Sequence, residues 1–319
     1  MTDDLLLKCK NLVKVAEDYC AEPEKYLRFF DVTINGKLRH LVTYQATDEG
    51  RKLRQLHNHF SEYLKTKYRQ AKSSFAYRKG ENILGCIERH SRGSVFLKTD
   101  IHSFFDSISF DRMFERLKQL NIPEDKTDLL AAVSKACFYQ DKLPLGFTSS
   151  PVLSDLFLTS LDRKYQKISG IEYTRYADDF IVSVKDPDEK KPLIVFRNKL
   201  EKDLDQLGLD LNKKKTYFRE LVRPGDAIHV LGLNIVKTSK GKNRITVSDR
   251  YIRDVSKAFG KWKSSGESEK SKDELLRIFG QISFIKNSSR SSYLKLKKLI
   301  RIKCNYSGHL TLKSLSKLG

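Results

Sequence analysis

Two adjacent aspartates, Asp178 and Asp179, are the residues of this sequence best suited to chemistry. Apolar runs at 171–176 and 180–184 predict two strands joined by a turn that carries both carboxylates. Like charges this close raise each other's pKa, so the pair is costly unless a divalent cation neutralises it. An isolated Asp-Asp pair in a turn is usually just solvated, so its meaning depends on what lies nearby.

A third carboxylate, Asp100, also follows an apolar strand, predicted at 94–99. If the two strands are neighbours, their ends can hold two cations about 4 Å apart, the arrangement for in-line phosphoryl transfer. One cation activates the attacking hydroxyl and the other stabilises the leaving oxygen. Catalysis of this kind rests on positioning and charge neutralisation rather than covalent chemistry.

The rest of the pattern predicts an α+β protein. Helical spacing of apolar residues predicts helices at 52–70, 109–120, 126–139, 151–168 and 190–207. Residues 229–236 are predicted as one strand, paired through a turn at 239–243 with a strand at 244–247. From Ser248 onward the pattern is helical, with breaks at 264–266 and 287–289.

The charge of the chain points to a polyanionic partner. Lys and Arg number 61 against 40 Asp and Glu, which gives a formal charge of +21. Residues 237–319 hold 21 of the basic and 6 of the acidic residues, so about +15 lies in the helical tail. A basic helical segment of this kind is expected to contact nucleic-acid phosphates.

A membrane surface and a disulfide framework are both disfavoured. No apolar run approaches the roughly 20 residues that a spanning helix requires. The N-terminal residues are acidic, whereas a signal peptide is basic there. The five cysteines are odd in number and far apart, which indicates reduced thiols in a cytoplasmic protein.

Five sequence blocks in this order resemble the motif series of reverse transcriptases, most closely the bacterial retron, group II intron and defence-associated types. The blocks are LKTDIHSFFDSI (97–108), LPLGFTSSPVLSDLFL (143–158), YTRYADDF (173–180), LGLDLNKKKT (207–216) and VLGLNIV (230–236). The resemblance covers roughly residues 25–247. It implies a right-hand polymerase fold with an N-terminal extension and fingers at 1–95, a palm at 96–247 and a basic helical thumb at 248–319.

The same resemblance implies the catalytic residues. Asp100 and Asp178 would ligate two Mg²⁺ ions, with Mn²⁺ as an alternative, and Asp179 would support the second site. Ile101, beside Asp100, is assigned to the metal and nucleotide sites. Lys215 matches the lysine that protonates or neutralises the leaving pyrophosphate.

Other residues match the nucleotide pocket. Phe105 corresponds to the bulky residue beneath the sugar, where a ring rejects a ribose 2′-OH and so favours dNTPs, while Phe104 is expected in the core. Leu145 and Gly146 belong to the block against the incoming nucleotide. Most relatives have Gln where this chain has Leu145 and Asn where it has Asp155. Because Leu cannot hydrogen-bond the nucleotide, we expect altered nucleotide affinity or fidelity rather than loss of chemistry.

Nucleic-acid contacts are implied in the fingers and the late hairpin. Arg39 matches the arginine that holds the triphosphate, and Arg78 and Lys79 match a segment that meets template phosphates, for which Arg geometry is well suited. Leu231 and Gly232 match the hairpin that grips the primer end.

The resemblance therefore implies an RNA-directed DNA polymerase that uses dNTPs to copy a dedicated structured non-coding RNA into DNA. The implied role is antiphage defence in the cytoplasm, with a second defence protein as a candidate partner and no membrane partner. A catalytically weak RNA-binding scaffold, or the polymerase of a diversity-generating element, are the alternatives. The block ending at His90 matches the retron pattern only at that histidine, so the type of reverse transcriptase stays open.

Overall fold

The computed structural model describes residues 7–34, 37–120, 126–265 and 272–315. The chain divides into two compact units. The first comprises Met1–Cys86, Phe96–Val184 and Lys190–Phe218, and the second comprises Ile87–Val95, Lys185–Glu189 and Arg219–Gly319. The predicted division into fingers, palm and thumb stays a prediction.

The first unit is built on a four-stranded sheet in the order β4-β5-β3-β6. Its strands are β3 (Val95–Asp100), β4 (Glu172–Tyr176), β5 (Asp179–Val184) and β6 (Tyr217–Glu220). Every residue of β5 after Asp179 is buried, as a short continuous apolar run predicts. β4 and β5 pair antiparallel, with Tyr176 opposite Asp179.

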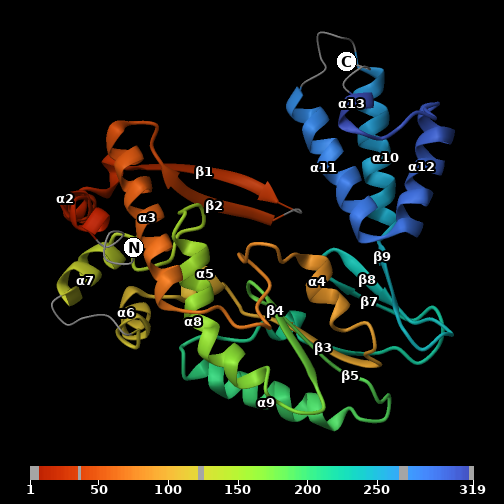
Figure 1. Cartoon of the computed structure of the whole chain (residues 1–319), viewed down its shortest axis with the longest axis horizontal. Coiled ribbons are helices and arrows are strands. Elements are labelled where there is room, and N and C mark those ends of the chain that lie inside the picture. The colour runs from red at the N-terminus through yellow and green to blue at the C-terminus, as the bar shows by residue number, and fades with distance from the viewer. Residues whose placement is uncertain (1–6, 35–36, 121–125, 266–271, 316–319) are drawn as a thin grey trace. The chain divides into compact units, whose positions relative to one another are not determined.

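Two helices cover this sheet. The first, α8 (Ser150–Tyr165), contacts β4, and the second, α9 (Lys191–Asp205), contacts β5 (Figure 1). Both lie within two or three residues of their predicted bounds. Most of α8 is buried on all sides, which is typical of a helix in the centre of a core. Its buried residues include two aspartates, Asp155 and Asp162, and a buried carboxylate requires partners.

The N-terminal part of the first unit contains a hairpin and a long helix. Strands β1 (Leu27–Ile34) and β2 (Lys37–Tyr44) pair antiparallel. Helix α3 (Asp48–Lys67) begins earlier than predicted because Thr47 caps it by accepting a hydrogen bond from the Gly50 N–H. The remaining elements are α2 (Val13–Ala21), η1 (Pro23–Lys25), α4 (Ile83–Glu88), α5 (Phe104–Ser107), α6 (Phe110–Lys118), α7 (Thr127–Lys135) and η3 (Lys213–Lys215).

The second unit combines a three-stranded sheet with helices. Strands β7 (Ala227–Val230), β8 (Leu233–Val236) and β9 (Arg244–Val247) form a meander in chain order. Helices α10 (Asp249–Ser264), α11 (Lys272–Ser288) and α12 (Arg290–Cys304) pack against one another, and α13 (Leu312–Leu315) follows (Figure 1). The helix breaks predicted at 264–266 and 287–289 are confirmed, because α10 ends at Ser264 and α11 at Ser288; Gly266 itself lies outside the described residues.

The prediction of a single strand at 229–236 was wrong. The chain turns back at Leu231 and Gly232, which separate β7 from β8 and have φ values of 51° and 83°. Two consecutive positive φ values are the pattern of a type I′ hairpin turn, in which Gly is favoured. Because apolar residues lie on both sides of this two-residue turn, the apolar pattern continues across it and predicts a single strand.

The remaining expectations concern cysteines and membrane spans. All five cysteines carry free thiols. Within the described ranges, no helix is both long enough and apolar enough to cross a lipid bilayer.

Candidate active site

Sheet topology brings the three predicted aspartates to one edge. Asp100 ends β3, Asp178 lies in the two-residue loop between β4 and β5, and Asp179 begins β5. Strands β3 and β5 are neighbours in the sheet. The N–H of Ile101 donates a hydrogen bond of 3.2 Å to the carbonyl of Asp178, which ties the two strand ends together.

Asp100 has one satisfied and one unsatisfied carboxylate oxygen. Its side chain is 4% exposed, and Oδ2 accepts a hydrogen bond from Nζ of Lys215. Oδ1 is buried and has no hydrogen-bond partner in the described part of the chain. A buried unpaired carboxylate oxygen is costly, and hard divalent cations prefer such oxygens as ligands. The donor set at this sheet edge therefore fits a Mg²⁺ site.

The neighbouring carboxylates are electrostatically suited to a cation. Burial raises the pKa of Asp178, and the charge of Asp100 raises it further, against the lowering effect of Lys215 and Arg39. Burial raises the pKa of Asp179 to about 6, although Lys98, 3.9 Å away, opposes the shift. A divalent cation would favour the ionised form of all three carboxylates.

The aspartates by themselves do not complete the coordination shell of a metal ion. Within the described ranges, no three His, Cys, Asp or Glu side chains converge into a preformed metal cage. Mg²⁺ commonly takes only one or two carboxylates from the protein and completes its shell with water and substrate phosphates. An incomplete set at Asp100 and Asp178 is thus consistent with a cation that the substrate helps to hold.

Lys215 is the one lysine of the run 213–215 that meets an active-site carboxylate. Its ammonium group bonds Asp100 across 115 positions of sequence, and this bond, offset by partial burial, raises the pKa of Lys215. The side chain is still 48% exposed, so it can reach other groups. Lys213 and Lys214 are exposed. Of these three lysines, Lys215 is the one placed beside Asp100, and its catalytic role stays a prediction.

The two phenylalanines after Asp100 differ in environment. Phe104 is 3% exposed, whereas Phe105 is partly exposed, and their ring centroids lie 5.5 Å apart. The carbonyl of Phe105 accepts a hydrogen bond of 3.2 Å from the N–H of Leu143, the first residue of the block that contains Leu145 and Gly146. The arrangement leaves Phe105 available to a ligand and places Phe104 in the core.

The block at Leu145 and Gly146 lies directly against strand β2. The carbonyl of Leu145 accepts a hydrogen bond of 3.0 Å from the N–H of Val42. Gly146 has φ of 119°, and a Cβ there would lie 2.4 Å from the carbonyl oxygen of Val42. The glycine is therefore required by backbone approach. Tyr44, which the sequence analysis missed, completes this contact by accepting a hydrogen bond of 2.8 Å from the Thr148 N–H.

The predicted finger residues lie on the same unit. Arg39 is exposed on β2, and its charge acts on Asp178. Arg78 is partly exposed, 3.9 Å from Glu81, and Lys79 is exposed. Tyr77, also missed, has a half-exposed ring, and burial together with the charge of Asp178 raises the pKa of its hydroxyl to about 12.

Leu231 and Gly232 form the hairpin turn of the second unit. Among the described residues, no atom lies within 4 Å of a Cβ built on Gly232, so its positive φ is what favours glycine there.

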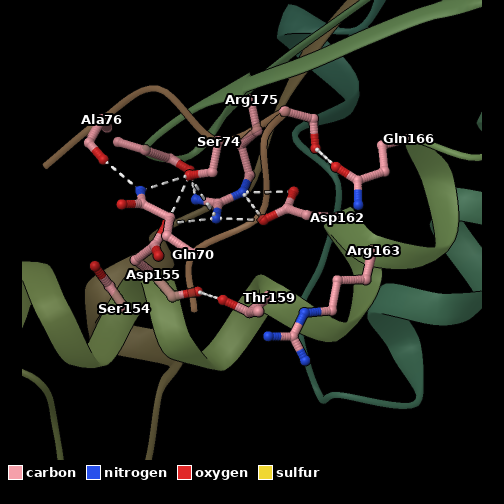
Figure 2. Close-up of polar contacts among 12 residues, drawn as sticks. Gln70, Ser74, Ala76, Ser154, Asp155, Thr159, Asp162, Arg163, Gln166 and Arg175 are labelled. Carbon is pink, nitrogen blue, oxygen red and sulfur yellow. Dashed lines mark hydrogen bonds and ion pairs between the residues drawn. The ribbon is translucent and has the colours of Figure 1, made fainter. Parts of the chain in front are cut away.

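The residue that sequence analysis most clearly overlooked is Arg175 on β4. It is fully buried, and its guanidinium bonds the carboxylates of Asp155 and Asp162 at 2.8 and 2.6 Å (Figure 2). Burial lowers the pKa of Arg175, but Asp162 and Asp155 more than reverse this effect. A charged residue inside an apolar strand, with two aspartates seven residues apart on one predicted helix, was the available signal.

The chain is similar in sequence to known reverse transcriptases. The sequence model described as "Reverse transcriptase (RNA-dependent DNA polymerase)" matches residues 35–235. The Retron Ec86 reverse transcriptase of Escherichia coli is 31% identical over 146 residues, which cover 45% of this chain and 44% of the relative. The Retron Ec73 reverse transcriptase of Escherichia coli is 29% identical over 178 residues, covering 51% and 55%. The Retron Mx162 reverse transcriptase of Myxococcus xanthus is 24% identical over 231 residues, covering 65% and 47%.

Solved structures with a similar fold include two telomerases. Apo telomerase from Candida tropicalis aligns with a TM-score of 0.55 and 10% identity, over 92% of this chain and 60% of that one. Telomerase from Candida albicans aligns with a TM-score of 0.51 and 11% identity, over 92% and 62%. Identities this low concern the fold alone.

The family model covers more than half of the chain, so this protein belongs to the reverse transcriptase family and has the right-hand polymerase fold. The curated relatives first matched are retron reverse transcriptases of bacteria. The matched regions span about half the length of these relatives.

Proposed function

We propose that this chain is an RNA-directed DNA polymerase that extends DNA by two-metal nucleotidyl transfer. The observation that carries the proposal is the buried, unpartnered Oδ1 of Asp100 on a strand end tied to Asp178. Asp100 and Asp178 would hold two Mg²⁺ ions, with Mn²⁺ as a substitute, and Asp179 would support the second. Bound there, the ions would activate the attacking hydroxyl and neutralise charge on the leaving oxygen.

The surrounding residues would bind and orient the nucleotide. Arg39 would hold the triphosphate, because a guanidinium offers paired donors to phosphate oxygens. Lys215, already hydrogen-bonded at the carboxylates, would give its proton to the leaving pyrophosphate. Phe105 would exclude a 2′-OH, and the Ile101 and Gly146 backbones would flank the nucleotide.

The template would be a structured non-coding RNA. Arg78 and Lys79 would contact template phosphates, and the turn at Leu231 and Gly232 would hold the primer end. Helix α12 carries six basic residues and no acidic residue, namely Arg290, Lys295, Lys297, Lys298, Arg301 and Lys303. Such a helix would add phosphate contacts and make RNA binding salt-dependent. The retron reverse transcriptases among the relatives favour a dedicated RNA of this kind.

The biological role that we propose is antiphage defence, with a second protein as a candidate partner. The residue ranges 1–95, 96–247 and 248–319 would then serve as fingers, palm and thumb. A scaffold that binds RNA without copying it is the alternative, and the polymerase of a diversity-generating element is another. Loss of phage protection in Asp178→Asn cells would support the enzymatic defence role.

In the first test, the RNA and DNA that co-purify with three proteins are sequenced. The proteins are the wild type, Asp178→Asn and the control Asp188→Asn. Asp188 is an exposed aspartate in the loop after β5, so its substitution controls for loss of one negative charge. We expect a discrete DNA complementary to one bound RNA in the wild type and the control only. Bound RNA without DNA in all three proteins, together with no primer extension in vitro, would contradict the polymerase and favour the scaffold.

A further inference from the structure

The loop that carries Asp178 is short and strained. Tyr176 pairs with Asp179, so only Ala177 and Asp178 connect β4 to β5. Ala177 has φ of 56°, in the left-handed region that Cβ sterics disfavour for residues other than glycine. A loop with this conformation depends on neighbouring groups to stay in place.

Both peptide carbonyls of the loop are held by specific donors. The carbonyl of Asp178 accepts from the N–H of Ile101 at 3.2 Å. The carbonyl of Ala177 accepts from Nη1 of Arg175 at 2.8 Å. The first donor, Ile101, directly follows Asp100 at the end of β3, and the second is a side chain from the same hairpin. The direction of the Asp178 side chain therefore depends on where the Arg175 guanidinium lies.

The guanidinium is oriented by a buried carboxylate pair. Asp162 accepts from Nε at 3.0 Å and from Nη2 at 2.6 Å, while Asp155 accepts from Nη2 at 2.8 Å (Figure 2). Both carboxylates and Arg175 are at most 1% exposed. Fork-shaped contact of this kind fixes the plane of the guanidinium, which a single ammonium group does not do.

Hydroxyl groups balance the extra negative charge. One guanidinium faces two carboxylates, so the cluster needs further donors. The hydroxyl of Tyr173 donates to Asp162 at 2.6 Å, and that of Ser74 donates to Asp155 at 2.6 Å. These bonds keep both carboxylates satisfied while Nη1 of Arg175 remains on the loop.

The cluster also connects this loop to residues 73–75, which precede Arg78 and Lys79. The N–H of Arg175 donates to the carbonyl of Ser73 at 2.8 Å, and the N–H of Phe75 donates to the carbonyl of Arg175 at 3.0 Å. Ser74 also accepts a hydrogen bond of 3.1 Å from Nη2 of Arg175. This segment leads directly to Arg78 and Lys79, so the base of the template-contacting fingers and the loop of Asp178 share one anchor.

We propose that Arg175 is a positioning residue for polymerisation, which holds the Ala177 carbonyl so that Asp178 keeps its place at the catalytic metals. The inference rests on the proposed function, because Arg175 acts only through Asp178. Asp155 and Asp162 orient the guanidinium. Arg175 does not touch the nucleotide, so its loss is expressed in kcat and in metal affinity rather than in nucleotide binding.

The test compares Arg175→Lys with Tyr173→Phe in primer extension over a range of dNTP and Mg²⁺ concentrations. Lysine retains the charge but has one nitrogen, which does not span both aspartates and the Ala177 carbonyl. We expect Arg175→Lys to lower kcat by about 10- to 100-fold, the scale for a misplaced catalytic group. The KM for dNTP should change by less than about 3-fold, while the Mg²⁺ concentration at half-maximal rate rises.

Tyr173→Phe is the matched structural control. It removes one buried hydrogen bond from the same cluster and leaves the bond between Arg175 and Ala177 intact. We expect wild-type kcat from this variant at a temperature where it is fully folded. If Arg175→Lys does not fold, Asp162→Asn replaces it, because that variant keeps the guanidinium paired with one carboxylate, Asp155. It should lower kcat in the same way, because Asp162 no longer orients the guanidinium as a carboxylate does.

Three outcomes would overturn the positioning role of Arg175 or the polymerase function on which it rests. A folded Arg175→Lys enzyme, or its substitute Asp162→Asn, with wild-type kcat and Mg²⁺ dependence would overturn the positioning role. Equal loss of kcat in Tyr173→Phe would also overturn it, because general weakening of the cluster would then explain the effect. An inactive wild type, matching Asp178→Asn, would instead overturn the proposed polymerase function, and the inference with it.

Discussion

Replacing His57 by glutamine tests how a buried histidine supports the segment from Leu145 to Thr148. His57 is fully buried on α3, with Nε2 2.9 Å from the carbonyl oxygen of Ala136 and Nδ1 2.8 Å from the hydroxyl of Tyr44. Since a carbonyl only accepts, Nε2 carries the proton and Nδ1 accepts from Tyr44. Tyr44 in turn holds the N–H of Thr148. The contact therefore requires a neutral histidine.

The cost of protonating His57 follows from its environment. Burial lowers its pKa from an ordinary 6.5 to about 3. Between these values the unfolded chain binds a proton that the folded chain does not, so stability is present above pH 6.5 and is lost as the pH falls toward 3. At about 1.4 kcal/mol per pH unit, the loss between pH 7 and pH 5 is about 2 kcal/mol. A glutamine amide can donate to Ala136 and accept from Tyr44 without titrating.

Urea unfolding of the wild type and His57→Gln at pH 7, 6 and 5, followed by far-UV circular dichroism, measures this effect. The stability advantage of the wild type should shrink by about 2 kcal/mol from pH 7 to pH 5. The difference between proteins cancels other titrating groups, such as His90, whose pKa burial also lowers to about 3. The fluorescence of the single tryptophan, Trp262, reports the unfolding of the second unit. It serves as a reference, because His57 lies in the first unit. A difference that stays constant with pH would refute the reasoning.

Four further predictions concern the site. Phe105→Ala should reduce the preference for dNTP over rNTP, measured as the ratio of kcat/KM values, and an unchanged ratio would show that Phe105 does not exclude the ribose 2′-OH. Leu145→Gln should lower the KM for dNTP because an amide can hydrogen-bond the nucleotide; the same KM in both proteins would contradict this. Gly146→Ala should destabilise the fold by about 3 kcal/mol or more, through backbone strain and the clash with the Val42 carbonyl. The control Gly170→Ala should cost about 1 kcal/mol, because no described atom lies within 4 Å of a Cβ built there. Equal melting temperatures of the two variants would refute this prediction. Chelation of divalent ions should abolish primer extension and added Mg²⁺ should restore it, whereas synthesis that persists in chelator would exclude the two-metal mechanism.

The elements that carry the aspartates were predictable because their signals are local. An apolar run ending at Asp100, and two runs on either side of Asp178, predict strand ends without knowledge of the fold. Helices such as α9 and α10 were found for the same reason. Periodicity alone predicted one strand across Leu231 and Gly232, because the turn contains only two residues between apolar runs, and only the resemblance indicated a hairpin there. Local patterns thus place elements better than the short turns between them.

The contacts among these elements were not predictable from spacing. Lys215 bonds Asp100 from 115 positions away, and Gly146 meets Val42 from more than 100 positions away. Such pairs depend on which apolar faces pack together, and many packings satisfy the same one-dimensional pattern. Resemblance to a family supplied the roles of Lys215 and Arg39, but it did not indicate what holds them.

By itself, the sequence determined the class of protein: three aspartates at strand ends, the ordered motif blocks and a basic helical tail. Only the tertiary structure decided that β3 lies beside β5, so that Asp100 and Asp178 share one sheet edge. It also decided that Arg175, a charge inside an apolar strand, meets two aspartates on α8 and the loop of Asp178. The physical reason is that a buried charge is stable only with its partners in place, and those partners are set by long-range packing.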